Sequence, residues 1–201
     1  MPYDFEFTGA TVVGLVYSTG VVLAGEKRVA IGNYLLSKTG KKVFKVLDKI
    51  GIASAGILAD MQAIAKILAA DLRLYELENK RQATVRTSAK LLSNILYSRK
   101  YFPYLASTII GGIDKEGKHL FSLDPIGSLI EDKYTALGSG SELALSVIEG
   151  EYDEKMTYEE AKNLAYKAIK LACGRDVLSG DGIDMLIIDM ATTDEIFIPL
   201  K

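Results

Sequence analysis

The side chains that most often carry catalysis are scarce in this sequence. His119 is the only histidine and lies in an alternating, strand-like run, and the sequence lacks the Gly-x-Ser-x-Gly turn of the serine hydrolases. Cys173 is the only cysteine and falls on the apolar side of a helical pattern, as a small buried side chain would. These two leave only carboxylates to complete a zinc site, so we expect no metal and no cofactor. Chemistry that depends on histidine or on a metal is therefore disfavoured.

Two glycine-rich turns are the next candidates, because backbone N–H groups at a helix N-terminus bind anions. They lie at 138–141 (Gly-Ser-Gly-Ser) and at 179–182 (Ser-Gly-Asp-Gly). Neither has the spacing of a P-loop or of a dinucleotide-binding turn. Each alone therefore indicates a helix cap or a tight turn.

The composition limits the class of protein. The chain has 201 residues, with 24 basic and 26 acidic side chains and a formal net charge of -2, which fits one globular domain. This balance gives no electrostatic basis for binding nucleic acid or a membrane surface. A lone cysteine indicates a reducing compartment, and no stretch resembles a signal peptide or a membrane span. We therefore expect a cytoplasmic protein.

The hydrophobic pattern predicts blocks of strands and helices in alternation. Short β-prone runs fill residues 11–54 and 105–138. Between these blocks, apolar residues at three- and four-residue spacing predict one helix from Leu58 and a second over 84–101.

A second pair of helices is expected after residues 138–141 and from Thr157, whose spacing to Glu160 is that of a capping box, and two strands close the chain. Both strand blocks are too apolar to leave a face in water. The pattern therefore predicts an α+β fold in which sheet packs on sheet with helix pairs outside, a four-layer αββα sandwich.

A series of short motifs occurs in one order from Thr11 to the last strand. Its members are Val13-Gly14, Gly20 to Ala24, Glu26, Arg28, Gly32-Asn33, Ser37-Lys38, Lys41-Lys42, Ala55-Gly56, Tyr101 to Tyr104, Gly111 to Asp114, Asp124 to Gly127, Gly138 to Gly140, Arg175-Asp176 and Ser179 to Asp184. In this order they resemble the β subunits of the proteasome core particle, above all archaeal ones, within the N-terminal nucleophile hydrolases. The resemblance implies the αββα fold of that family, with a propeptide-like extension at 1–9 and a single β-type domain at 10–201.

The resemblance also implies a peptidase that needs no histidine. In this family an N-terminal threonine attacks the peptide carbonyl with its hydroxyl, and its own α-amine relays the proton. Lys42 matches the lysine that lowers the pKa of that hydroxyl, Glu26 matches its acidic partner, and the N–H of Gly56 matches the oxyanion donor. Three more positions match the residues that hold the amino terminus and the proton-relay water: Ser139, Asp176 and Ser179.

The nucleophile position departs from the family pattern. Aligned on Val13-Gly14, Gly9 precedes the cleavage bond and Ala10 occupies the place of the threonine. Alanine has no hydroxyl, so in this register the chain neither cuts peptides nor removes residues 1–9. Three explanations are open: a naturally silent subunit of a mixed ring, a deliberate threonine-to-alanine change that keeps the propeptide, or Thr11 as the nucleophile after removal of residues 1–10.

Strand geometry disfavours Thr11. Side chains alternate between faces, so a shift of one residue turns Thr11 away from Lys42 unless a bulge restores the direction. The otherwise intact supporting residues favour a deliberate change, because a subunit that had long been silent would be free to lose them. Lys42 and Glu26 also have a purely structural interpretation as a buried ion pair. Such a pair can persist in a silent subunit, because removing one partner leaves the other as an uncompensated buried charge.

The resemblance implies a substrate pocket and a set of partners. Its five pocket positions are mainly apolar and predict large hydrophobic side chains before the cut: Val29, Gly40, Phe44, Ser54 and Leu58. The implied partners are proteasome α subunits, other β subunits in a heptameric ring that can hold a second β type, unfolded polypeptides, and a regulatory ATPase acting through the α ring. A two-tier bacterial peptidase of the same fold is less favoured, because 101–104 and 124–127 resemble proteasome β chains more closely.

Overall fold

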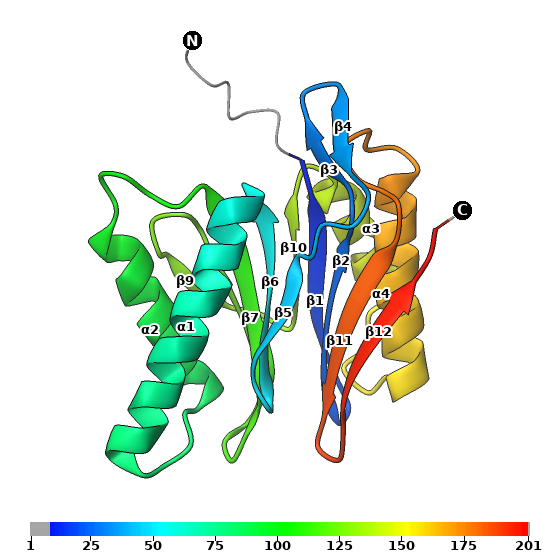
Figure 1. The fold of residues 1–201 in the computed structure, drawn as a ribbon. Helices are drawn as coiled ribbons and strands as arrows, with labels where there is room; N and C mark the ends of the chain where they lie inside the picture. Colours follow the sequence, from blue (N-terminus) through cyan, green and yellow to red (C-terminus); the bar gives the residue numbers. More distant parts are fainter. Residues whose placement is uncertain (1–8, 201) are drawn as a thin grey trace.

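The fold is given by a computed structural model that describes residues 9–200 (Figure 1). The expected extension at 1–9 therefore lies outside the described residues, apart from Gly9. The strands form two five-stranded antiparallel sheets and a separate hairpin. The first sheet has the order β10 (Tyr134–Gly138), β1 (Thr11–Tyr17), β2 (Gly20–Glu26), β11 (Ile183–Asp189), β12 (Thr193–Ile198). The second has the order β5 (Val43–Leu47), β6 (Ile50–Gly56), β7 (Ala106–Asp114), β8 (Gly117–Leu123), β9 (Leu129–Glu131), and the hairpin joins β3 (Val29–Ile31) to β4 (Tyr34–Ser37).

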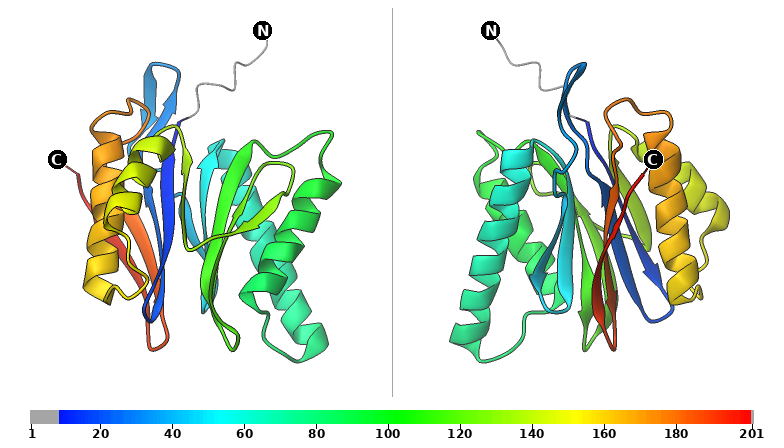
Figure 2. Two further views of the ribbon diagram at one scale, coloured as in Figure 1. Left: turned by 180° about the vertical axis from the view of Figure 1, so that it is seen from behind. Right: turned by 45° about the vertical axis from the view of Figure 1, so that its right-hand side comes forward.

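The sheets face each other, and a pair of helices covers the outer face of each (Figures 1 and 2). Helices α1 (Leu58–Asn79) and α2 (Val85–Ser98) pack on the second sheet, while α3 (Ser141–Glu151) and α4 (Tyr158–Cys173) pack on the first. The predicted αββα sandwich is therefore confirmed. No helix within residues 9–200 combines the length and apolarity needed to cross a membrane.

Strand β1 shows how the layers are built. Val13 and Leu15 point into the core between the first sheet and helices α3 and α4, whereas Val12 and Val16 point into the core between the two sheets. Both faces are buried, so the strand is mainly apolar after Thr11. The same alternation places neighbouring residues at the start of β1 on opposite faces, which decides the direction of Thr11.

The helix boundaries follow from local signals. Thr84 caps α2 by accepting the N–H of Thr87, and Thr157 forms the predicted capping box with Glu160 at the start of α4. Helix α1 continues to Asn79, beyond the last apolar residue of the predicted stripe at Leu72.

Each of the first two strand blocks in the sequence contributes strands to both sheets, and the order of the blocks does not predict this. Strands β1 and β2 of the first block belong to one sheet and β5 and β6 to the other, and β10 of the second block returns to the first sheet beside β1. This return brings the end of β10 and the helix start at 138–141 against the beginning of β1, where the candidate site lies.

Candidate active site

A buried ion pair forms one half of the site. Lys42, just before β5, bonds through Nζ to Glu26 Oε1 and to the carbonyl of Arg28 at 2.6 Å. The side chains of Lys42 and Glu26 are 2% and 0% exposed. The Glu26 carboxylate also accepts the N–H groups of Thr11 at 3.3 Å, Arg28 at 2.6 Å and Gly180 at 3.0 Å. Both buried charges are therefore paired and hydrogen-bonded, the condition under which burial is tolerated.

Burial acts on the two partners in opposite directions. It raises the pKa of Glu26 and lowers the pKa of Lys42, and the attraction between the two charges opposes both shifts. A lysine whose pKa is lowered gives up its proton more readily near neutral pH. Burial therefore makes the Lys42 ammonium a better proton donor than an exposed lysine.

A chain of hydroxyl groups ending on a carboxylate forms the other half. Asp176, in the loop between α4 and β11, accepts Ser139 Oγ at 2.5 Å and Ser179 Oγ at 2.6 Å, both on Oδ2. Thr11 Oγ1 lies 2.7 Å from Ser179 Oγ. Because the single proton of Ser179 goes to the carboxylate, Thr11 donates to Ser179. The three residues expected to hold an amino terminus thus converge on the start of β1.

Ala10 and Thr11 point to opposite sides of the first sheet. The methyl group of Ala10 joins the apolar cluster between the sheets, with Ala55. Thr11 is fully buried, its hydroxyl bonds Ser179, and its backbone N–H faces Glu26. Strand β1 pairs residue by residue with β10 from Thr11 and with β2 from Val12. The regular pairing gives the one-residue alternation that turns Thr11 toward Ser179.

Two glycines end strands where another backbone segment approaches closely. Gly138 ends β10 with a φ of 101°, and a Cβ there would collide with the carbonyl of Ala10 and lie 3.1 Å from Ala55 Cβ. Gly56 ends β6 with a φ of 143°, and a Cβ there would collide with the carbonyl of Leu105. The position expected to donate an oxyanion N–H therefore follows directly on Ala55, at the Ala10 end of the sandwich.

Of the five expected pocket positions, Ser54 contacts the ion pair through its backbone, and the others are placed by different neighbours. Gly40 packs directly against Val29, which a Cβ at residue 40 would strike. Ser54 donates its N–H to the carbonyl of Lys42 at 2.9 Å, but its side chain is fully buried and bonds Thr108 Oγ1 at 3.0 Å. Phe44 and Leu58 are partly buried and pack against the core beneath α1 and α2.

The lone histidine lies in β8 toward the other end of the sandwich. Nδ1 of His119 is 2.8 Å from Glu131 Oε1, and Nε2 is buried without a hydrogen-bond partner among the described residues. A ligand atom of His119 lies within 4.8 Å of carboxylate oxygens of Asp114 and Glu116. The oxygens of Asp114 already accept the N–H groups of Val85, at the start of α2, and of Glu116, both at 2.7 Å. These bonds give Asp114 a structural role in closing the turn and capping the helix.

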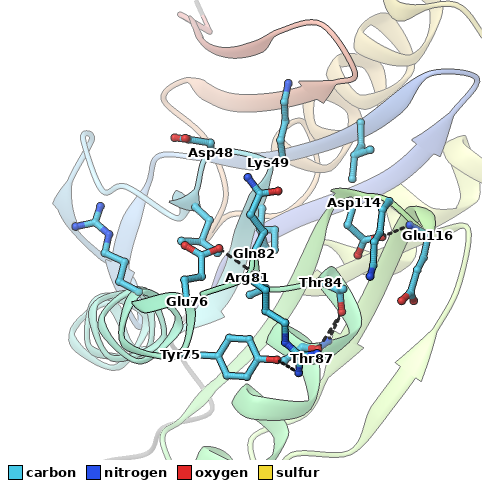
Figure 3. A pocket seen from close by; sticks show the side chains of 16 residues that line it. Asp48, Lys49, Tyr75, Glu76, Arg81, Gln82, Thr84, Thr87, Asp114 and Glu116 are labelled. Carbon is cyan, nitrogen blue, oxygen red and sulfur yellow. Dashed lines mark hydrogen bonds between the residues drawn. The ribbon is translucent and has the colours of Figure 1, made fainter. Parts of the chain in front are cut away.

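The end of the sandwich away from Ala10 also carries an open cavity of about 650 Å³. Figure 3 shows Tyr75, Glu76 and Arg81 from the end of α1 and the following loop, with Asp48 and Asp114 elsewhere in the lining. None of the residues expected to act in catalysis lines it. This cavity and the cluster of buried charges are therefore separate features.

Cys173 packs partly buried at the end of α4, against the core beneath α3 and α4. Burial raises the pKa of its thiol to about 12. A thiol with that pKa is protonated at neutral pH, as expected of a packing residue rather than a nucleophile.

Sequence reasoning gave no role to two residues that the structure places at the site. Arg28 stood in the motif series without an assigned contact, yet its backbone touches both members of the ion pair. Asp181 was part of a glycine-rich turn and bonds the guanidinium of Arg28. An arginine two residues after Glu26 and an acidic residue between two glycines were the available signals.

The facing sheets, the outer helix pairs and the buried lysine and glutamate at the start of β1 define the N-terminal nucleophile hydrolase sandwich. The family model described as "Proteasome subunit" matches residues 6–188. The "Proteasome subunit beta 2" of Thermofilum pendens is 54% identical over 196 residues, covering 98% of this chain and 96% of that protein. The "Proteasome subunit beta 2" of Pyrobaculum neutrophilum is 56% identical over 189 residues (94% and 93%), and the "Proteasome subunit beta 1" of Ignicoccus hospitalis is 53% identical over 180 residues (90% of each). The chain belongs to the proteasome subunit family, as a β subunit of the archaeal type.

Proposed function

We propose that this chain builds the inner chamber of a proteasome core particle, where unfolded proteins are degraded, and that it lacks its own nucleophile. One observation carries the proposal. The ion pair of Lys42 and Glu26 and the hydroxyl chain of Ser139, Asp176 and Ser179 meet at the first residues of β1, where Ala10 offers only a methyl group. Without a hydroxyl at residue 10 there is no group to form the covalent intermediate.

The supporting residues favour an alanine that replaces a threonine. Glu26 keeps four hydrogen-bond donors and Asp176 keeps two serine hydroxyls, so the site retains contacts that serve no reaction in this chain. A structural ion pair alone would account for Lys42 and Glu26, but not for the hydroxyl chain on Asp176. We therefore propose a deliberate threonine-to-alanine change at residue 10.

The assembly follows from membership of the family. β subunits of proteasomes generally assemble with α subunits in stacked rings. For this chain we propose a heptameric β ring beside an α ring, a regulatory ATPase acting through the α ring, and a cytoplasmic location. The relatives named beta 1 and beta 2 support a ring that holds a second β type.

Thr11 is the competing nucleophile. Its hydroxyl already donates into a chain that ends on Asp176, and its nitrogen lies 3.3 Å from Glu26 Oε1. These contacts are reversed relative to what the family resemblance implies, because the hydroxyl faces Ser179 and the nitrogen faces the ion pair. We therefore favour Ala10 as the nucleophile position and an inactive chain as written.

The test is intact-mass and N-terminal analysis of the chain after assembly with α subunits, beside an Ala10→Thr variant. We expect the given chain to keep residues 1–9 and the variant to lose them, because self-cleavage needs the restored hydroxyl. A variant that stays uncleaved would make this a scaffold subunit whose site is retired beyond residue 10. A given chain that already begins at Thr11 would establish the competing nucleophile. If the variant is active, we expect it to prefer large hydrophobic residues before the cut.

A further inference from the structure

The two halves of the site come from separate parts of the chain. The ion pair belongs to β2 and to the segment before β5, whereas Asp176 and Ser179 belong to the loop between α4 and β11. Hydroxyl and amine chemistry tolerates little misplacement, and a shift of about 1 Å costs on the order of a hundredfold in rate. Some contact must therefore hold this loop against β2.

Arg28 makes contacts on both sides. Its backbone N–H donates to Glu26 Oε2 at 2.6 Å, and its carbonyl accepts Lys42 Nζ at 2.6 Å. Its guanidinium donates to the carbonyl of Val177 at 2.8 Å and to both carboxylate oxygens of Asp181, at 2.8 and 3.4 Å. One residue thus touches both members of the ion pair and both ends of the 177–181 segment, which contains Ser179.

The loop is shaped to receive this guanidinium. Gly180 lies under it, and a Cβ at residue 180 would be 2.6 Å from Arg28 Nη2. The carbonyl of Gly180 accepts the N–H groups of Lys27 and Arg28, both at 3.1 Å, and its own N–H donates to Glu26 Oε2. Asp181 has a φ of 71°, in the left-handed region that a side chain rarely adopts unless other contacts hold it there.

We propose that Arg28 and Asp181 form a clamp that sets the position of Ser179 relative to the Lys42 and Glu26 pair. The Arg28 and Asp181 side chains are 27% and 12% exposed, so solvent screens this contact less than a surface pair. The two-point geometry of guanidinium on carboxylate fixes direction as well as distance. Arg28 and Asp181 are positioning residues, because they act on the reacting groups through Gly180 and Ser179.

The first arm of the test measures the clamp by hydrogen exchange and needs no peptidase activity. In the given chain, assembled with α subunits, hydrogen exchange is followed in peptides covering 177–182, where the Gly180 amide reports the bond to Glu26. We expect Arg28→Ala and Asp181→Asn to lose protection there. Arg86→Ala, which removes an exposed arginine paired with Glu131, serves as the matched control and should change nothing in this segment. Unchanged protection in both clamp variants would overturn the proposal.

The second arm rests on the proposed function and uses the Ala10→Thr background. We expect Arg28→Ala to lower kcat between about 10- and 100-fold with little change in KM. Added guanidinium should restore part of kcat to Arg28→Ala but none to Lys42→Ala, a readout that a general loss of stability would not give. If Arg28→Ala fails to assemble, Asp181→Asn carries the same test, with a smaller loss of kcat.

A full kcat in Asp181→Asn, or no rescue of an assembled Arg28→Ala, would contradict the clamp. If Ala10→Thr itself is inactive, the proposed function fails and the exchange arm still decides the clamp.

Discussion

Charged residues are buried at one end of the sandwich, the site end near Ala10, and border open space at the other, the cavity end. At the site end, Lys42 and Glu26 are buried and every charge has partners from several segments. At the cavity end, lined by Asp48, Glu76 and Arg81 among others, charges border open space, and the contact of the Arg81 guanidinium is with a tyrosine hydroxyl (Figure 3). A buried pair gives little net stability over apolar residues of the same size, whereas surface charges cost little to keep. The burial at the site end is therefore better explained by chemistry than by stability.

Two glycines with a positive φ, Gly138 and Gly117, differ in the space around them. Gly138 at the site end has a positive φ and no space for a side chain, because the carbonyl of Ala10 and the methyl of Ala55 surround it. Gly117, in the turn between β7 and β8, has a φ of 131° but open space around it. Close backbone approach thus accounts for Gly138, and turn geometry alone accounts for Gly117.

The largest effect should come from breaking the buried pair. Lys42→Ala leaves Glu26 as an unpaired buried charge, and we expect the free energy of unfolding to fall by about 3–5 kcal/mol. Arg86→Ala, which breaks a pair whose arginine is 55% exposed, should cost less than about 1 kcal/mol. Denaturant unfolding of the three chains measures the difference. Equal losses would show that burial does not distinguish the two ends.

A smaller difference should separate the two glycines. Gly117→Ala should lower the free energy of unfolding by about 1–2 kcal/mol, because only the backbone conformation disfavours a side chain there. Gly138→Ala should show the same loss, and a further loss of about 1–3 kcal/mol because its Cβ must displace the start of β1. Unfolding midpoints of the two variants, measured side by side, test this order. A Gly138→Ala variant as stable as Gly117→Ala would mean that the strand ends are not tightly packed on Ala10.

The smallest expected effect is a pH dependence at the site end. Hydrogen bonds from Arg28 hold the pKa of Asp181 below its ordinary value of 3.8. A carboxyl whose pKa is lower in the folded state stabilises the fold above its unfolded pKa, and this contribution is lost as the pH falls through the folded value. Asp181→Asn should therefore lose less stability than the parent chain as the pH falls below about 4. Thermal unfolding across that range measures it, and parallel curves for the two chains would contradict the contact.

Local patterns predicted most of the fold. Both strand blocks and the first two helices show their burial in the spacing of apolar residues, while the turn at 138–141 and the capping box at Thr157 indicated the other two helices. The sheet to which β5, β6 and β10 belong could not be predicted. An apolar run indicates that a strand is buried, but it does not indicate which strand pairs with it. The short strand β3 is apolar, but its three residues are fewer than the roughly four to eight that a sequence pattern needs to indicate a strand.

The candidate site was predictable in parts. The resemblance pointed to Lys42, Glu26 and Asp176, and strand alternation predicted that Thr11 turns away from Lys42. The contacts of Arg28 with Asp181 depend on a loop conformation with a positive φ, and no local sequence pattern specifies which distant side chain such a loop meets.

Above all, we propose that the site is complete except for the hydroxyl at residue 10. This proposal is tested most directly by peptide hydrolysis in particles assembled with α subunits and this chain as the only β subunit. We predict no hydrolysis by the given chain, clear hydrolysis by Ala10→Thr, and loss of that activity in Ala10→Thr/Lys42→Ala. An assembled Ala10→Thr particle without activity, or a given chain as active as the variant, would contradict it.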